Sequence, residues 1–181
     1  MSELLLGIDF ETTNLTLHPN ADLSKQPRAI EFGGALVDMD TGEIVEELSI
    51  LINPEEEITA EITKITGITN DDVRDAPKFI EILPQLRHMF GQATVVAAHN
   101  LPFDRAILKY ELMRANVLDF PWPSRELCTV GAYREFFGKN PKLTELYEFV
   151  IGEPLAQTHR ALEDVKAMIS IIQKEELWRI S

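Results

Sequence analysis

Apolar and polar positions divide the chain into a strand-rich first part and a helix-rich remainder. Residues 3–10 form an almost continuous apolar run, which is typical of a strand buried in a sheet. Two more runs, at 30–39 and 43–53, are joined by Asp40-Thr41-Gly42, a turn sequence of the β-hairpin type. A fourth, short apolar run covers 95–98. The pattern therefore predicts four strands, and the second and third form a hairpin.

Most of the other segments show the three- and four-residue apolar spacing of helices. Residues 15–27 are polar and predict a surface loop, and 121–123 (Pro-Trp-Pro) predict a rigid connector. Antiparallel strands followed by strand–helix alternation predict an α/β fold, a mixed sheet covered by helices. We find no repeat or linker, and expect residues 1–181 to form a single domain. The helical segments are 58–74 (short pieces broken at Gly67), 77–90, 103–116, 126–138, 142–150 and 160–178.

Two acids, Asp9 and Glu11, lie at the end of the first predicted strand. Residues two apart on a strand project from the same face, so both carboxylates point the same way. Two like charges on a buried surface repel and lose hydration, which costs several kcal/mol unless a positive charge compensates them. Oxygen ligands suit a divalent cation, and the pair therefore predicts a metal site.

Asp104, Asp164 and His159 are further candidates. Asp104 follows the strand at 95–98 and starts a helix, where it could instead be a helix cap. We expect His99, at the end of that strand, to support Asp104 through a local hydrogen bond. Asp164 could be an exposed helical acid, but its position beside the apolar stripe of the last helix disfavours that alternative. On one continuous helix, His159 and Asp164 would point about 140° apart. We therefore expect His159 in the loop that enters the helix, reaching back over Asp164.

The composition is that of a globular protein with an uneven charge. Hydrophobic residues make up 45% of the chain and charged residues 26%. The net charge is −13, and residues 1–75 carry all of that excess. A protein that binds nucleic acid nonspecifically through electrostatic attraction usually has an excess of basic residues, so strong nonspecific binding is not expected. The acidic half is either a solvated surface or a docking site for a basic partner protein.

Cellular location is predicted from what the sequence lacks. Cys128 is the only cysteine, which excludes an intrachain disulfide and a zinc site built on cysteines. No apolar stretch approaches the roughly 18 residues of a membrane span, and Glu3 precedes the first leucines where a signal peptide would be basic. We expect an intracellular, cytoplasmic protein with no membrane association.

Three strings carry a family resemblance, and two shorter ones lie between them in the expected order. They are Asp9-Phe10-Glu11-Thr12-Thr13, His99-Asn100-x-x-Phe103-Asp104 and His159-Arg160-Ala161-Leu162-x-Asp164, with Ile52-Asn53-Pro54 and Ile65-Thr66-Gly67-Ile68-Thr69 between them. Together they resemble the motifs of the DnaQ-like, or DEDDh, 3′–5′ exonuclease family. The resemblance runs from residue 4 to about 173.

The resemblance implies a ribonuclease H-like fold, in which helices flank a five-stranded mixed sheet. It also implies two divalent cations, Mg²⁺ or Mn²⁺, held by Asp9, Glu11, Asp104 and Asp164. His159 would be the general base, because a histidine side chain can accept a proton near neutral pH. Hydrolysis at a free 3′ end of single-stranded nucleic acid would release a nucleoside 5′-monophosphate.

Substrate contacts follow from the same resemblance. Just after the first acids, backbone amides and an apolar side chain would contact the terminal nucleotide. Ile65 would pack on the other face of its base. Asn100 and Phe103 would position its sugar and phosphate. For Leu15, Ile65 and Phe103 the alternative is plain core packing. Asn14 replaces the usual Gly, and Asn tolerates left-handed backbone angles, while Thr66 replaces a frequent His. The implied contact residues are Thr12, Thr13, Leu15, Ile65, Asn100 and Phe103.

Three functions are compatible with the sequence. The first is a metal-dependent 3′–5′ exonuclease on single-stranded ends, with DNA favoured over RNA. The second is a nuclease that trims RNA or short oligonucleotides. The third is a proofreading subunit of a DNA polymerase, with a replication or repair protein as its partner, or an inactive binding module. The inactive reading is disfavoured because all five catalytic positions are present.

Overall fold

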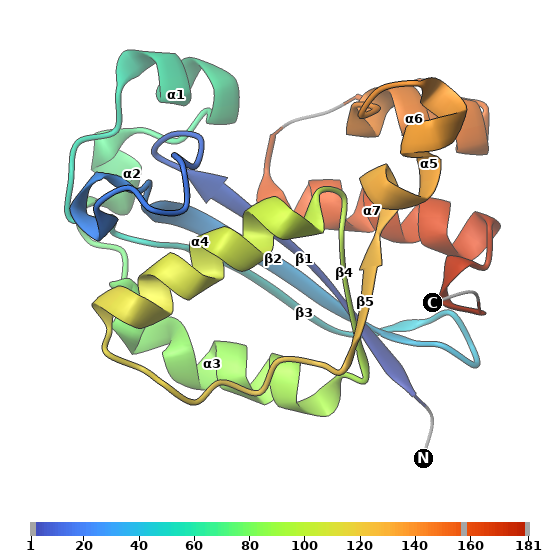
Figure 1. Ribbon diagram of the computed structural model, residues 1–181, viewed down its shortest axis with the longest axis horizontal. Coiled ribbons are helices and arrows are strands. Elements are labelled where there is room, and N and C mark those ends of the chain that lie inside the picture. The colour runs from blue at the N-terminus through green and yellow to red at the C-terminus, as the bar shows by residue number, and fades with distance from the viewer. Residues whose placement is uncertain (1–2, 157–158, 180–181) are drawn as a thin grey trace.

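A five-stranded mixed sheet forms the centre of the computed structural model, which describes residues 3–156 and 159–179 (Figure 1). The strand order is β3-β2-β1-β4-β5. The β1–β2 and β2–β3 pairs are antiparallel, whereas β1–β4 and β4–β5 are parallel. The strands are β1 (Leu4–Thr12), β2 (Ala29–Asp38), β3 (Ile44–Leu51), β4 (Val95–Ala98) and β5 (Arg125–Cys128).

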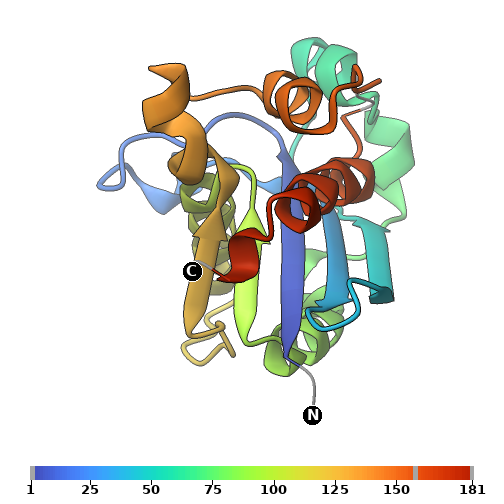
Figure 2. The ribbon, with the colours of Figure 1, turned by 90° about the vertical axis from the view of Figure 1, so that its right-hand side faces the viewer.

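Helices cover both faces of this sheet. Figure 2 shows α7 across one face and α3 behind the other. One buried cluster joins α3 and α4 to β1 and β2, and a second joins α6 and α7 to the opposite face. The helices are α1 (Ala60–Thr66), α2 (Asn70–Arg74), α3 (Phe79–Gln92), α4 (Leu101–Arg114), α5 (Thr129–Phe137), α6 (Leu143–Ile151) and α7 (Ala161–Lys174), with short 3-10 turns at Leu23–Lys25 and Leu177–Arg179.

The strand β1 sends alternate side chains to the two faces. Leu6, Ile8 and Phe10 pack in the cluster with α3 and α4. Leu5 lies in the cluster with α7, and a Cβ added to Gly7 would meet α7 side chains at 3.0–3.2 Å. Because side chains alternate along a strand, the two acids of β1 project on the α7 side.

The helix α7 crosses β2 at very short range. A Cβ added to Gly33 would lie 2.3 Å from the backbone nitrogen of Leu162 and 2.4 Å from the carbonyl carbon of Ala161. Backbone atoms cannot move aside as the end of a flexible side chain can. Gly33 therefore lets the first turn of α7 lie directly on the sheet.

Most predicted elements are present, and the predicted fold class is confirmed. The hairpin turn lies between β2 and β3, where Gly42 has a φ of 76°. The helix expected over 126–138 is wrong at its start, because Arg125–Cys128 pairs with β4 as the fifth strand. Four residues are too few to show a strand period, and pairing with a buried neighbour decides their structure. The last helix ends at Lys174 rather than 178, and Glu176 follows with a φ of 50°.

No helix among the residues that the structure describes combines the length and apolarity needed to cross a membrane.

Substituting Gly33→Ala tests the close approach of α7. We expect a loss of about 1–3 kcal/mol or more in the free energy of unfolding, because the new methyl group overlaps backbone atoms. Urea unfolding followed by circular dichroism measures it. The control is Gly131→Ala in α5, where an added Cβ meets only the Cys128 side chain at 3.5–3.7 Å and alanine favours the helix. Equal stability of the Gly33 variant and the wild type would contradict the packing.

Candidate functional site

Asp104 reaches the acidic end of β1 from the first turn of α4. Its side chain is only 2% exposed, and its Oδ1 accepts a hydrogen bond from the Phe10 N–H at 3.0 Å. The Phe10 amide lies between Asp9 and Glu11 in the strand. Asp104 is not the cap of its helix, because α4 begins after Asn100. The capping alternative is therefore wrong, and the side chain instead ties α4 to β1.

Asp164 and His159 approach Glu11 from the start of α7. Asp164 is buried in the first turn of the helix, and His159 lies in the loop before it, as the rotation argument predicts. A ligating atom of Glu11, of His159 and of Asp164 all lie within 4.8 Å of one another. His159 has a φ of 50°, a left-handed conformation that is uncommon outside glycine and is found in functional sites.

The environment of the site raises the pKa of three of its carboxyl groups. Burial, followed by the Asp104 carboxylate, holds the pKa of Asp9 well above its ordinary value. Burial raises the pKa of Asp104 to about 8, although the hydrogen bond from the Phe10 amide acts in the other direction. Burial raises the pKa of Glu11 to about 8, and nearby Asp164 adds to the effect. Each shift means that the folded chain disfavours the ionised form.

A divalent cation fits this donor set. Carboxylate oxygens are the ligands that hard cations prefer, and an imidazole adds a nitrogen beside them. The clustered atoms of Glu11, His159 and Asp164 lie close enough together to contact one ion. The repulsion among buried acids is the condition that a bound cation would relieve.

A groove of about 510 Å³ adjoins the acids and brings together most of the predicted substrate contacts. Leu15, which is 74% exposed, and Ile65, which is 48% exposed, both line the groove, so core packing is not their role. Phe103 lines the groove and packs partly against the core. Thr12 and Thr13 also line it, whereas Asn100 is exposed at the start of α4 and outside the lining. The structure thus gathers five of the six residues.

Side-chain hydrogen bonds stabilise the rim of this groove. The Thr12 hydroxyl donates to the Asn14 carbonyl at 2.7 Å, and Asn14 Oδ1 accepts from the Leu15 amide at 2.8 Å. Asn14 is not among the residues with positive φ, so the left-handed turn expected there is absent. The buried Thr66 hydroxyl accepts from the Ile68 amide and donates to the Ile62 carbonyl.

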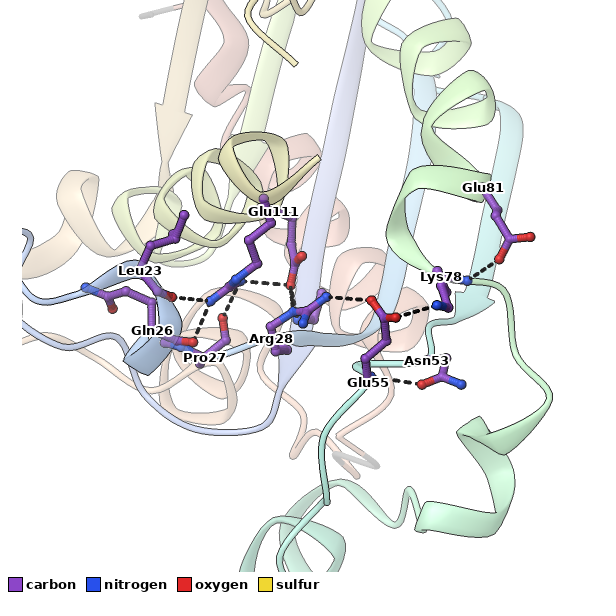
Figure 3. Close-up of polar contacts among 11 residues, drawn as sticks. Leu23, Gln26, Pro27, Arg28, Asn53, Glu55, Lys78, Glu81 and Glu111 are labelled. Atoms are coloured by element: carbon purple, nitrogen blue, oxygen red, sulfur yellow. Dashed lines mark hydrogen bonds and ion pairs between the residues drawn. The ribbon is translucent and has the colours of Figure 1, made fainter. Parts of the chain in front are cut away.

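The predicted polar loop between β1 and β2 is anchored to α4 by an ionic cluster (Figure 3). Glu111 is 2% exposed and accepts from Arg28 Nε at 3.1 Å and Arg114 Nη1 at 3.2 Å. Arg114 also donates to the carbonyls of Leu23, Gln26 and Pro27. Loss of either arginine would leave the buried Glu111 carboxylate with uncompensated charge, which is costly. These contacts therefore hold the loop that carries Leu15 against α4.

Pattern reasoning missed two buried acids, Glu111 and, close to the site, Glu31 on β2. Glu31 pairs across the sheet with Glu11, is fully buried and holds Arg160. The signal was available, because Glu31 interrupts an apolar strand just as Asp9 and Glu11 do. His99 was expected to support Asp104, which is wrong. Its Nδ1 lies 2.8 Å from Thr129 Oγ1 and its Nε2 3.1 Å from the Pro141 carbonyl, on the side of α5 and α6.

Comparison with known proteins identifies the family. The profile of the RNase_T family, described as exonuclease, matches residues 6–172. The chain therefore belongs to this exonuclease family, as the motifs predicted.

Two curated relatives are bacterial DNA polymerases. The PolC-type DNA polymerase III of Caldanaerobacter subterraneus is 34% identical over 168 residues, which are 92% of this chain. The PolC-type enzyme of Clostridium perfringens is 31% identical over 165 residues, or 91% of this chain. The chain spans only 11% of the length of either relative.

Solved structures confirm the fold. The nuclease domain of 3′hExo, a DEDDh family member bound to rAMP, superposes with a TM-score of 0.77 at 20% identity, covering 98% of this chain and 93% of that one. Exonuclease X in complex with 5′-overhanging duplex DNA gives a TM-score of 0.65 at 24% identity, covering 95% and 93%. The predicted ribonuclease H-like fold is confirmed.

The raised carboxyl pKa values predict how stability depends on pH. In the metal-free protein, folded acids hold protons that the unfolded chain releases above about pH 4.5. The melting temperature should therefore fall as pH rises from about 5 to 8 and level off above. Added Mg²⁺ or Mn²⁺ should restore it, more at pH 8 than at pH 5.

Differential scanning fluorimetry in a chelator and in excess Mg²⁺ measures both effects. The variant Glu11→Gln, which keeps the size of the side chain but cannot ionise, should flatten the metal-free pH slope. A melting temperature that rises between pH 5 and 8 in the chelator, or a slope unchanged in the variant, would contradict the electrostatic argument.

Proposed function

We propose that this chain is a metal-dependent 3′–5′ exonuclease that removes nucleotides from free 3′ ends of single-stranded nucleic acid, with DNA preferred over RNA. One observation carries the proposal: acids from β1, α4 and α7 converge with a histidine beside an open groove. The family membership and the similarity to DNA polymerases support the nuclease activity and the DNA preference.

Five residues carry the reaction in this proposal. Asp9, Glu11, Asp104 and Asp164 hold two divalent cations, Mg²⁺ or Mn²⁺, and the raised carboxyl pKa values support that need for positive charge. When bound, the cations neutralise the acids and stabilise negative charge that develops on the phosphodiester. His159 accepts the proton of the attacking water, since its ring lies beside Glu11 and Asp164. The products are a nucleoside 5′-monophosphate and a strand one nucleotide shorter.

The groove receives the terminal nucleotide in this proposal. The exposed side chains of Leu15 and Ile65 contact opposite faces of its base, and Phe103 packs beside its sugar. Backbone amides of Thr12 and Thr13 contact the terminal residue, while Asn100 contacts the phosphate. Only single-stranded ends present an unstacked base to such a wedge.

The wider setting is also proposed. Residues 1–181 form one exonuclease domain, although residues 1–2, 157–158 and 180–181 lie outside the described part of the chain. The PolC-type relatives favour a second candidate function, proofreading in contact with a replication protein. A cytoplasmic location is part of the proposal. The rAMP-bound neighbour favours a third, trimming of RNA or short oligonucleotides.

End-labelled substrates test the activity. The protein is incubated with Mg²⁺ or Mn²⁺ and a 5′-labelled single-stranded DNA, RNA or duplex. We expect a ladder of shortened labelled strands, formed fastest on single-stranded DNA. Immediate release of the 5′ label as a mononucleotide would contradict the 3′–5′ polarity.

Substituting Asp9→Ala or His159→Ala tests the assigned roles. Each variant should lower kcat by at least about 100-fold, the usual contribution of acid–base and electrostatic groups, while circular dichroism stays unchanged. His88→Ala is the matched control, because His88 is an exposed residue of α3 and should keep full activity. Retained activity in either site variant would contradict the assignment.

Substituting Leu15→Ala or Ile65→Ala tests the wedge. Loss of one apolar contact should raise KM for a single-stranded oligonucleotide about tenfold, which corresponds to about 1.4 kcal/mol of burial. Leu118→Ala is the control, because Leu118 is 99% exposed and lines a different surface groove. An unchanged KM in both variants would contradict the proposal that Leu15 and Ile65 contact the terminal base.

A further inference from the structure

The fully buried carboxylate of Glu31 is satisfied almost entirely by the start of α7. Arg160 Nε donates to Oε1 at 3.0 Å and to Oε2 at 3.2 Å, and Arg160 Nη2 donates to Oε1 at 2.6 Å. The backbone N–H of Ala161 donates to Oε2 at 3.0 Å. Ser49 Oγ adds a longer contact at 3.5 Å. Both carboxylate oxygens are therefore committed to holding Arg160 and Ala161.

These contacts replace the missing cap of α7. Arg160 occupies the N-cap position, and its side chain makes no capping hydrogen bond. Glu31 instead supplies the acceptor from a neighbouring strand, and its negative charge faces the positive end of the helix dipole. The bidentate geometry with Arg160 fixes orientation as well as distance.

The anchored residues lie in the sequence between His159, in the loop before α7, and Asp164, in the first turn of α7. His159 immediately precedes Arg160, and Asp164 follows three residues after Ala161 with its amide bonded to the Arg160 carbonyl. On the sheet, Glu31 pairs directly with Glu11. The close approach at Gly33, two residues along β2, leaves the first turn of α7 little room to slide.

We propose that Glu31 and Arg160 are positioning residues, which hold His159 over Glu11 and Asp164 through their ion pair. The left-handed backbone of His159 is uncommon, and fixing the next two residues is a direct way to maintain it. This inference rests on the proposed function, in which His159 accepts a proton from the attacking water.

Substituting Glu31→Gln in the full chain tests the inference. The amide keeps the size of the side chain but breaks the charge-assisted pairing, so kcat should fall about 10–100-fold, the usual effect of a residue that orients a catalytic group. KM should stay within about twofold of the wild-type value. Arg160→Gln should likewise lower kcat and leave KM nearly unchanged. It replaces the Glu31 variant if that variant fails to fold, because the Arg160 side chain is 48% exposed.

The control is Glu47→Gln, which removes another ion pair between the sheet and α7. Lys166 Nζ lies 3.2 Å from Glu47 Oε2, and both side chains are partly exposed. This variant should keep wild-type kcat. Equal losses in the control and in the Glu31 variant would show a general effect on α7 and overturn the proposal.

A double-mutant cycle separates positioning from stability. In a His159→Ala background, Glu31→Gln should lower kcat less than about threefold, because no imidazole remains to be positioned. Equal fold-losses with and without His159 would overturn the proposal.

Histidine NMR gives a readout that does not depend on activity. Ring signals of the four histidines are recorded from the metal-free protein labelled at histidine, and His159 is assigned by the signal lost in His159→Ala. Glu31→Gln should shift or broaden the His159 signals and leave those of His18 and His88 in place. Unchanged His159 signals would overturn the inference. If the wild type releases no nucleotide while the His159 signals respond, the proposed function fails and the positioning role stands.

Discussion

Repulsion among buried carboxylates is the constraint on which the rest of this structure depends. Asp9, Asp104 and Glu11 all have raised pKa values, and Glu31 adds a further acid opposite Glu11. Within the described residues, Arg160 and the Ala161 amide compensate the charge of Glu31, and the Phe10 amide donates to Asp104. Clustered acids cost stability, and proteins retain such strain where the site does chemistry.

The fold holds the acids together by geometry that leaves little freedom. Alternation along β1 sends its acids to the α7 side, while its apolar residues anchor the opposite face. Gly7 and Gly33 let α7 cross the sheet so closely that Asp164 reaches Glu11. On the other side of β1, the Phe10–Asp104 hydrogen bond fixes α4. Three elements far apart in sequence thus meet at one end of one strand, and small residues matter as much as the acids.

Period and motif reasoning predicted the parts of the structure that depend on local pattern. The strands of the hairpin, the helices and the loop position of His159 all follow from spacing and rotation. The fifth strand was missed because Arg125–Cys128 is a strand only through its pairing with β4. His99 was assigned to the wrong neighbour because its partners, Thr129 and Pro141, come from distant segments. Glu31 carried the same signal as Asp9, but no motif drew attention to it.

The charge distribution limits how the site attracts a polyanion. The whole excess of −13 lies in residues 1–75, which also supply β1 and much of the groove. A net charge of −13 does not favour long-range attraction of a nucleic acid strand, so recognition is expected to depend on short-range contacts. In the proposed function, the exposed apolar side chains of Leu15 and Ile65 would provide contacts that charge does not weaken. Cations held by the acids would supply the remaining attraction at the point where the phosphate lies. Metal binding and substrate binding are therefore expected to be coupled more strongly here than in a nuclease with a basic surface.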